Sequence, residues 1–227
     1  MVSARLDGMS SGSFLLLDID GTLVDSFAGI RHSLLLALDE LGVDRPSEEF
    51  LSTIAGPPME ETLGRLGMDE DEARRGLHTY LRYFGESGWS MSQPYPGALD
   101  FLRRAAATEG LKVATCSSKG EAFARRTLEH FRMMEHLDFL GAAEEHGTRR
   151  TKIAVLDYVL DSLAIDPSRD RVVLVGDRIH DFEAATARSI DSIAAEWGYG
   201  RPAEYAEATH SAPDFAATER ILDDYFR

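Results

Sequence analysis

The segment that most constrains the fold is a short apolar run, Phe14 to Leu17, which ends in the carboxylates of Asp18 and Asp20. An apolar run of this length is typical of a strand that is buried on both faces in a parallel sheet. Side chains two positions apart on a strand point to the same side, so both acids lie together where the strand ends. Like charges this close repel each other unless a cation or a shared proton intervenes. The segment therefore predicts a buried strand that leads directly into a site of chemistry.

The part of the chain after Pro94 alternates between helical and strand-like segments. Such alternation is typical of a Rossmann-like α/β fold, a doubly wound parallel sheet with helices on both faces. The first strand is expected at about 13–19, and the later strands at about 111–117, 137–141, 171–176 and 190–195. The expected helices cover about 98–109, 120–131, 150–163, 181–188 and 216–226.

Residues 24–92 carry a different pattern, because their apolar residues recur at helical spacing and nothing in them is strand-like. Pro94-Tyr95-Pro96-Gly97 then interrupts the helical pattern. We expect two domains: an α/β core built from residues 1–23 and 93–227, and an α-helical cap domain at 24–92 that is inserted after the first strand.

The net charge of −15 makes the chain a poor match for a nucleic-acid polymer or an anionic membrane surface. No segment reaches the roughly 20 consecutive apolar residues of a membrane span, and no secretory leader is evident. Cys116 is the only cysteine, so neither an intramolecular disulfide nor a cysteine-based metal site is expected. These features favour a cytoplasmic protein, either a monomer or a homodimer, that acts on a small molecule.

Polar residues follow three of the expected strands. Asp18 and Asp20 follow the first, Ser117 and Ser118 the second, and Asp177 the strand at 171–176. The carboxyl ends of parallel strands share one edge of the sheet, where ligands bind in folds of this class. Two further polar residues, Lys152 and Asp181, lie at the starts of expected helices. We therefore expect one crevice that collects acids, hydroxyls and a lysine.

These motifs, DIDGTL at 18–23, Ser117, Lys152 and GDRIHD at 176–181, resemble those of the haloacid dehalogenase superfamily of phosphohydrolases in type, order and spacing. The helical insertion resembles the alpha-helical cap of that family. GPPMEET at 56–62, GTRRTK at 147–152 and WGYG at 197–200 are similar to a branch named phosphoglycolate phosphatase or 5′-nucleotidase.

The resemblance implies a Mg²⁺-dependent phosphomonoester hydrolase that works through an aspartyl-phosphate. Asp18 would be the nucleophile and Asp20 the general acid and then the general base. Ser117 and Lys152 would complete the catalytic set. Phosphate binding would fall to Gly21, Thr22, Ser117, Ser118 and Lys152. Asp18, Asp20 and Asp177 would hold Mg²⁺, and Asp181 would orient a water or a neighbouring side chain beside it.

Other chemistries of the superfamily fit less well. Asp20 argues against a dehalogenase, which lacks the second Asp, and the absence of Lys from 24–92 argues against a phosphonate hydrolase. A sugar-phosphate mutase and a non-catalytic regulatory binding protein stay open. Lys119 is expected either at the rim of the crevice or in solvent. Specificity is expected from the loop at 55–60, where nothing obviously grips a second carboxylate, so phosphoglycolate and nucleoside 5′-monophosphates both remain candidate substrates.

Overall fold

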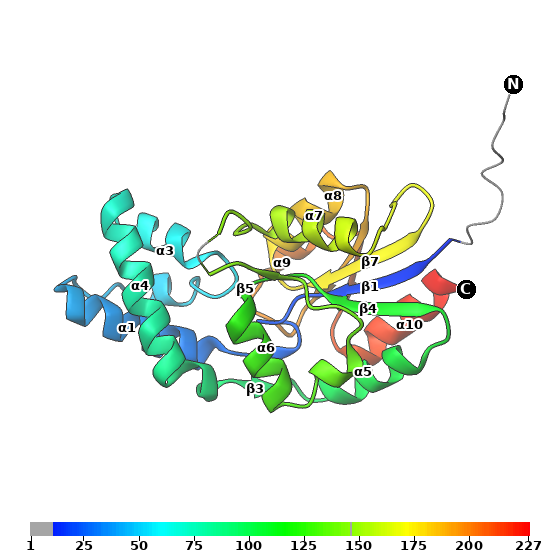
Figure 1. The fold of residues 1–227 in the computed structure, drawn as a ribbon, viewed down its shortest axis with the longest axis horizontal. Coiled ribbons are helices and arrows are strands. Elements are labelled where there is room, and N and C mark those ends of the chain that lie inside the picture. The colour runs from blue at the N-terminus through cyan, green and yellow to red at the C-terminus, as the bar shows by residue number, and fades with distance from the viewer. Residues whose placement is uncertain (1–10, 146) are drawn as a thin grey trace, which may run out of the picture.

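A five-stranded parallel sheet forms the centre of the computed structural model, which describes residues 11–145 and 147–227 (Figure 1). Residues 1–10 of the expected core lie outside the described residues. The strand order is β4-β1-β7-β8-β9. The strands are β1 (Ser13–Leu17), β4 (Leu111–Thr115), β7 (Arg171–Gly176), β8 (Asp191–Ala195) and β9 (His210–Ala212). The predicted α/β class and parallel sheet are confirmed.

Strand β1 lies inside the sheet and pairs on both sides, with β4 and with β7. Leu15, Leu16 and Leu17 are fully buried, as expected for a strand covered on both faces. Leu17 is in register with Thr115 on one side and with Val175 on the other. The three strands therefore end level with one another, which brings the loops that follow them to one edge of the sheet.

Helices cover both faces of this sheet (Figure 1). One buried cluster packs Leu15 and Leu17 against α5 (Ala98–Ala107), α6 (Glu121–His130) and α10 (Phe215–Phe226). A second cluster packs Leu16 against α7 (Lys152–Ser162) and α8 (Ile179–Ala187). Alternate residues of β1 thus serve opposite cores, which is the signature of a doubly wound sheet.

Several elements differ from the sequence-based expectation. The predicted strand at 137–141 is reduced to one bridge between Phe139 and Ala114, and the pairing moves to β6 (Ala142–Ala143) against β5 (Ser117–Gly120). The 3₁₀ helix η2 (Met134–His136) precedes this stretch. Strand β9 and the short helix α9 (Pro202–Tyr205) were not predicted, because each is too short to show a periodic pattern.

The helical insertion contains α1 (Phe27–Leu41), α2 (Glu48–Leu51), α3 (Met59–Arg65), α4 (Glu70–Glu86) and the 3₁₀ helix η1 (Gly88–Met91). It has its own buried cluster, with Leu34, Leu63 and Phe84 near its centre. The expectation that 24–92 holds no strand is wrong at one point. Val24–Asp25 forms β2, which pairs antiparallel with β3 (Gln93–Pro94), so the chain enters and leaves the insertion side by side.

Within the described residues, none of the helices combines the length and the apolar character that crossing a lipid bilayer requires.

Candidate active site

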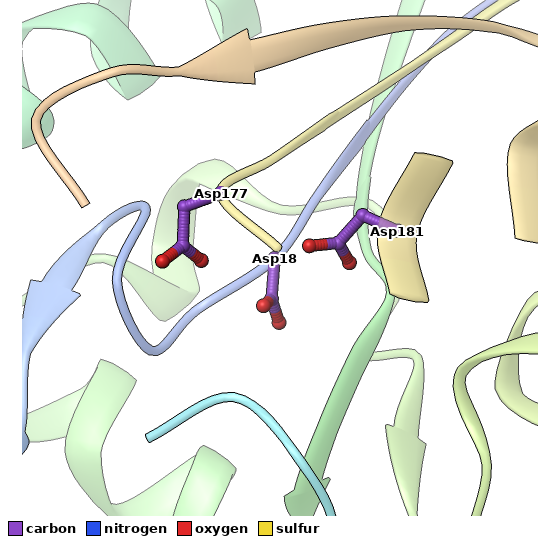
Figure 2. Close-up of side chains that lie close together, drawn as sticks. All are labelled: Asp18, Asp177 and Asp181. Carbon is purple, nitrogen blue, oxygen red and sulfur yellow. The ribbon is translucent and has the colours of Figure 1, made fainter. Parts of the chain in front are cut away.

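The loops at the carboxyl ends of β1, β4 and β7 bring five sequence-predicted residues together: Asp18, Ser117, Lys152, Asp177 and Asp181. All five are at least 95% buried. Figure 2 shows the three carboxylates, with Asp18 between Asp177 and Asp181. These residues from separate strand ends and helix starts thus lie together, as the sequence predicts, and their roles stay predictions.

The three carboxylates form a tight acidic cluster, with one oxygen of each lying within 4.8 Å of the others. Burial raises the pKa of Asp18 to about 6, partly offset by Lys152 and reinforced by the charge of Asp181. Burial and the neighbouring charges of Asp18 and Asp181 likewise raise the pKa of Asp177 well above its ordinary value. Three acids in this arrangement repel one another and are stabilised by any cation that reaches them.

Lys152 provides one such cation at the first residue of α7. Its Nζ lies 2.9 Å from Asp18 Oδ1 and 2.6 Å from Asp181 Oδ1, and it donates to the Cys116 carbonyl at 2.9 Å. The two carboxylates raise the pKa of Lys152 against the opposing effect of burial. The lysine is therefore a fixed positive charge that tethers Asp18 from one side.

Lys152 bridges Asp18 and Asp181, and Asp177 lies on the other side of Asp18 from Asp181 (Figure 2). Its Oδ2 accepts from the Tyr199 amide at 2.7 Å, whereas its Oδ1 is buried and has no hydrogen-bond partner among the described residues. An orphaned carboxylate oxygen beside a second carboxylate fits a hard divalent cation such as Mg²⁺, which prefers oxygen ligands. Asp18 and Asp177 therefore fit the expected metal.

Gly21 and Thr22 form the turn after Asp20. Gly21 has φ of +87°, and a Cβ there would lie 2.3 Å from Asp177 Oδ2. Glycine is thus required both by the backbone conformation and by the close approach of the Asp177 carboxylate. Thr22 is fully buried, and its carbonyl accepts from Trp197 Nε1 at 2.9 Å. Their predicted part in phosphate binding stays a prediction.

Asp20 is not part of this cluster and is held by two other residues. Ser26 Oγ donates to Asp20 Oδ1 at 2.5 Å, and Lys119 Nζ lies 2.9 and 3.0 Å from its two oxygens. Lys119 also lies 4.8 Å from the ring centroid of Phe84 in the insertion. Of the two places expected for Lys119, solvent is wrong, because 4% of its side chain is exposed, whereas the crevice is right, because Lys119 lines the cavity beside Asp20.

Ser117 and Ser118 follow β4 as expected. The Ser117 hydroxyl accepts from the Lys119 amide at 3.3 Å and its hydrogen bond to Asp18 lowers the pKa of that acid. Ser118 is half-buried and borders the same cavity as Asp18 and Asp20. Both serines are thus beside the acid that the sequence identifies as the nucleophile.

The site opens into a cavity of about 80 Å³ between the sheet edge and the insertion. The wall from the insertion is mainly apolar and includes Ile30, Met59, Leu77, Tyr80, Leu81 and Phe84. The floor from the core carries Asp18, Asp20, Ser117 and Lys119. The loop at 55–60 contributes four residues, Gly56 to Met59, as expected for a segment that faces the crevice.

Two arginines of the core that the sequence analysis did not single out contact the insertion. Arg150 forms an ion pair with Glu60, and Arg178 donates to the Ala55 carbonyl. Arg178 also donates to Glu204 at 3.0 Å. The arginine in GDRIHD was visible as part of a motif, but its partner in the insertion was not, because the contact spans 123 positions of the chain.

Comparisons with known proteins agree with this geometry. The family model described as haloacid dehalogenase-like hydrolase matches residues 15–195. The tyrosine-protein kinase PtkA of Mycobacterium tuberculosis is 37% identical over 199 residues, which are 88% of this chain and 67% of that protein. A structure of PtkA superposes with a TM-score of 0.77 at 34% identity, covering 93% of this chain and 98% of the other.

Two further relatives carry names of phosphatases. The 5′-nucleotidase of Pseudomonas aeruginosa is 29% identical over 214 residues, covering 93% of this chain and 96% of its own length. The phosphoglycolate phosphatase of Rhodospirillum rubrum is 28% identical over 214 residues, covering 89% of this chain and 88% of its own length. The resemblance to the family and to this branch is confirmed.

Proposed function

The chain belongs to the haloacid dehalogenase-like hydrolase family, and from that premise we propose that it is a Mg²⁺-dependent phosphomonoester hydrolase acting on a small phosphorylated metabolite. The observation that carries the proposal is Asp18, a buried carboxylate placed between Lys152 and the orphaned oxygen of Asp177. A carboxylate fixed between a lysine and an oxygen that fits Mg²⁺ is suited to attack a phosphoryl group, because the lysine and a bound metal would neutralise the charge of that group. The proposed division is a core at 1–23 and 93–227 and a cap at 24–92.

In the proposed first step, an oxygen of Asp18 forms a bond to phosphorus while the bond from phosphorus to the leaving oxygen breaks. Asp20 gives its proton to that leaving oxygen as general acid. In the second step, Asp20 takes a proton from water, which attacks phosphorus and releases inorganic phosphate with Asp18 restored. The bonds from Ser26 and Lys119 hold the Asp20 carboxylate in place for both proton transfers.

The remaining residues of the site position the phosphoryl group. Lys152, the Ser117 hydroxyl and the Ser118 amide are proposed to contact its oxygens, with Gly21 and Thr22 shaping the turn beneath it. Asp18, the Asp20 carbonyl and Asp177 would hold Mg²⁺, and Asp181 would keep its neighbours oriented. The metal would supply charge neutralisation for the phosphoryl oxygens.

The charges around the cavity favour an uncharged leaving group. Lys119 is paired with Asp20, Arg150 with Glu60, and Lys152 with Asp18 and Asp181. None of these cations is left over for a second anionic group on the substrate, and the opposing wall is mainly apolar. Phosphoglycolate carries a carboxylate that would lack a partner, whereas a nucleoside 5′-monophosphate presents a neutral ring to the wall. We therefore rank nucleoside monophosphates first.

The test is phosphate release from nucleoside 5′-monophosphates, phosphoglycolate, sugar phosphates and p-nitrophenyl phosphate, with Mg²⁺ or with EDTA. We expect Mg²⁺-dependent release that disappears in Asp18→Asn, with nucleoside monophosphates ahead of phosphoglycolate. Because one relative is named as a tyrosine-protein kinase, the panel also includes ATP with a tyrosine peptide. A chain that phosphorylates the peptide and releases no phosphate from any ester would overturn the proposal, as would a sugar-phosphate isomer formed without release.

A further inference from the structure

Helix α1, the first helix of the insertion, begins without the usual hydrogen bond from its own N-cap residue. That residue is Ser26, and its side chain makes no capping bond to the helix. Its backbone has φ of −112° and ψ of 6°, outside the extended conformation that an N-cap serine normally adopts. The hydroxyl instead donates to Asp20 Oδ1 at 2.5 Å. Ser26 thus holds a site residue and leaves the start of α1 to another partner.

The first amides of α1 are bound by Asp25, whose Oδ1 accepts from the Phe27 amide at 3.1 Å, and by Tyr199, from the loop that follows β8. Its hydroxyl oxygen accepts from the amides of Ser26 at 2.7 Å and of Phe27 at 3.1 Å, and donates to Asp25 Oδ1 at 2.9 Å. A hydroxyl can donate once and accept twice, so all of its bonding capacity is spent on the first residues of the insertion. A side chain more than 170 positions away therefore takes over the capping function.

The backbone of the same residue is fixed to the acidic cluster. The Tyr199 amide donates to Asp177 Oδ2 at 2.7 Å. The glycines on either side also lie close to Asp177. A Cβ on Gly198 would lie 2.4 Å from Asp177 Cβ, and one on Gly200 would lie 1.9 Å from the Asp177 carbonyl oxygen. Tyr199 therefore has little freedom to move apart from Asp177.

We propose that Tyr199 is a positioning residue that binds the start of α1 from the Asp177 loop, and so holds the Ser26 backbone where the Ser26 hydroxyl reaches Asp20. One residue then links the proposed metal site, the entry to the insertion and the proposed general acid. Without the Tyr199 hydroxyl, the Ser26 amide loses its acceptor and the Phe27 amide keeps only Asp25 Oδ1, so the backbone no longer holds the Ser26 hydroxyl on Asp20. The catalytic consequence rests on the proposed function, whereas the capping relation does not.

The kinetic test uses Tyr199→Phe, which removes the hydroxyl and keeps the ring. A misplaced general acid slows esters with poor leaving groups more than esters whose leaving group departs unaided. We expect kcat to fall about tenfold for an alkyl phosphate and about twofold for p-nitrophenyl phosphate, with KM little changed. An equal fall for both esters, or none, would overturn the link to Asp20. The matched control is Tyr225→Phe, which removes a hydroxyl bound to the Val172 carbonyl on the far side of the core.

The second test is a double-mutant cycle with Ser26→Ala. In the parent, where Ser26 does not cap, this substitution should slow alkyl phosphate turnover and leave stability nearly unchanged. In the Tyr199→Phe background it should slow turnover no further, because the Ser26 hydroxyl no longer holds Asp20, and it should again leave stability nearly unchanged. An equal fold-reduction of turnover by Ser26→Ala in both backgrounds would contradict the proposal.

The stability half of this cycle requires no substrate. If the parent releases phosphate from no ester, the proposed hydrolase activity fails, while a loss of stability in Tyr199→Phe, measured by urea unfolding, still tests the cap. If the parent is active and Tyr199→Phe unfolds at the same urea concentration as the parent, the proposed hydrolase stands and the capping relation fails.

Discussion

The floor and the wall of the cavity are built on opposite principles. The floor consists of buried acids and lysines from the core, each held by short ion pairs or hydrogen bonds, such as Lys152 between Asp18 and Asp181. The wall consists of apolar side chains from the insertion, such as Phe84 and Tyr80, which stack with ring centroids 5.7 Å apart. The floor would select a substrate by the geometry of its ion pairs and hydrogen bonds, and the wall by its shape. Substitutions in the floor and in the wall should therefore differ in the kind and the size of their effects.

The largest effect is expected at the centre of the floor. Asp18→Asn should lower kcat by at least about 10⁴-fold, because an amide cannot attack phosphorus. Rapid quenching with p-nitrophenyl phosphate and intact mass spectrometry should find a phosphorylated species in the parent and none in the variant. Asp161→Asn, on the exposed face of α7, is the matched control. A phosphorylated Asp18→Asn protein would show that another residue of the floor is the nucleophile.

The next effect concerns the stability of the floor rather than its chemistry. Lys152→Met leaves Asp18 and Asp181 buried without their cation, and should lower the free energy of unfolding by about 3–5 kcal/mol in the absence of metal. The control is Lys112→Met, which breaks the ion pair between Lys112 and Asp138. Because 58% of the Lys112 side chain is exposed, this variant should lower the free energy of unfolding by less than about 1 kcal/mol. Urea unfolding in EDTA measures both. Equal losses of stability in the two variants would mean that Lys152 does not offset repulsion between the buried acids.

A third effect is the pH dependence of the metal-free protein. Burial raises the pKa of Asp18 from 3.8 to about 6, so the folded state binds this proton more tightly than the unfolded state. The corresponding stability is present at low pH and is lost as the pH rises from about 4 to about 6, by roughly 3 kcal/mol.

Urea unfolding at several pH values in EDTA should show this fall, and Asp18→Asn should reduce it. Asp138→Asn is the control, because hydrogen bonds from Lys112 and Val113 outweigh burial and lower the pKa of Asp138, so its contribution lies below this range. Saturating Mg²⁺ should restore the lost stability in the parent. A free energy of unfolding that is constant or rises between pH 4 and pH 6 in EDTA would contradict the raised pKa of Asp18.

The smallest effect is expected at the wall. Phe84→Leu keeps an apolar side chain but removes the ring beside Lys119, and should raise KM for a nucleoside monophosphate about tenfold. Glycerol phosphate, which is too small to use the wall, should be affected little. Phe131→Leu, which packs in the core away from the cavity, is the control. A larger loss of kcat than of KM would mean that the wall also takes part in the chemistry of the floor.

The sequence predicted the floor far better than the wall. Asp18, Lys152, Asp177 and Asp181 follow strands or begin helices, and the topology of a parallel sheet brings such positions together whatever surrounds them. The burial of Lys119 was not predicted, because a single lysine just after a predicted strand carries no sign of burial, and its partner Asp20 lies 99 positions earlier.

The wall and the contacts of Tyr199 at the entry to the insertion could not be predicted, because no local sequence pattern encodes them. The aromatic and glycine residues of WGYG were visible, but the bonds from Tyr199 to Ser26 and Asp177 arise only when three distant segments meet. Strand β9 was missed for a related reason: its three residues are defined by pairing with β8 rather than by their own periodicity.

The pairing of β2 with β3 brings the two ends of the helical insertion together at one point of the core. The Tyr95 amide donates to the Leu23 carbonyl at 3.0 Å, so the chain leaves the core and returns to it at almost the same point. Insertions of very different length can occupy such a junction, because the closure entropy of a loop grows only with the logarithm of its length. Exchange of this insertion between homologous chains could therefore alter the choice of substrate while the sheet and its acids stay where they are.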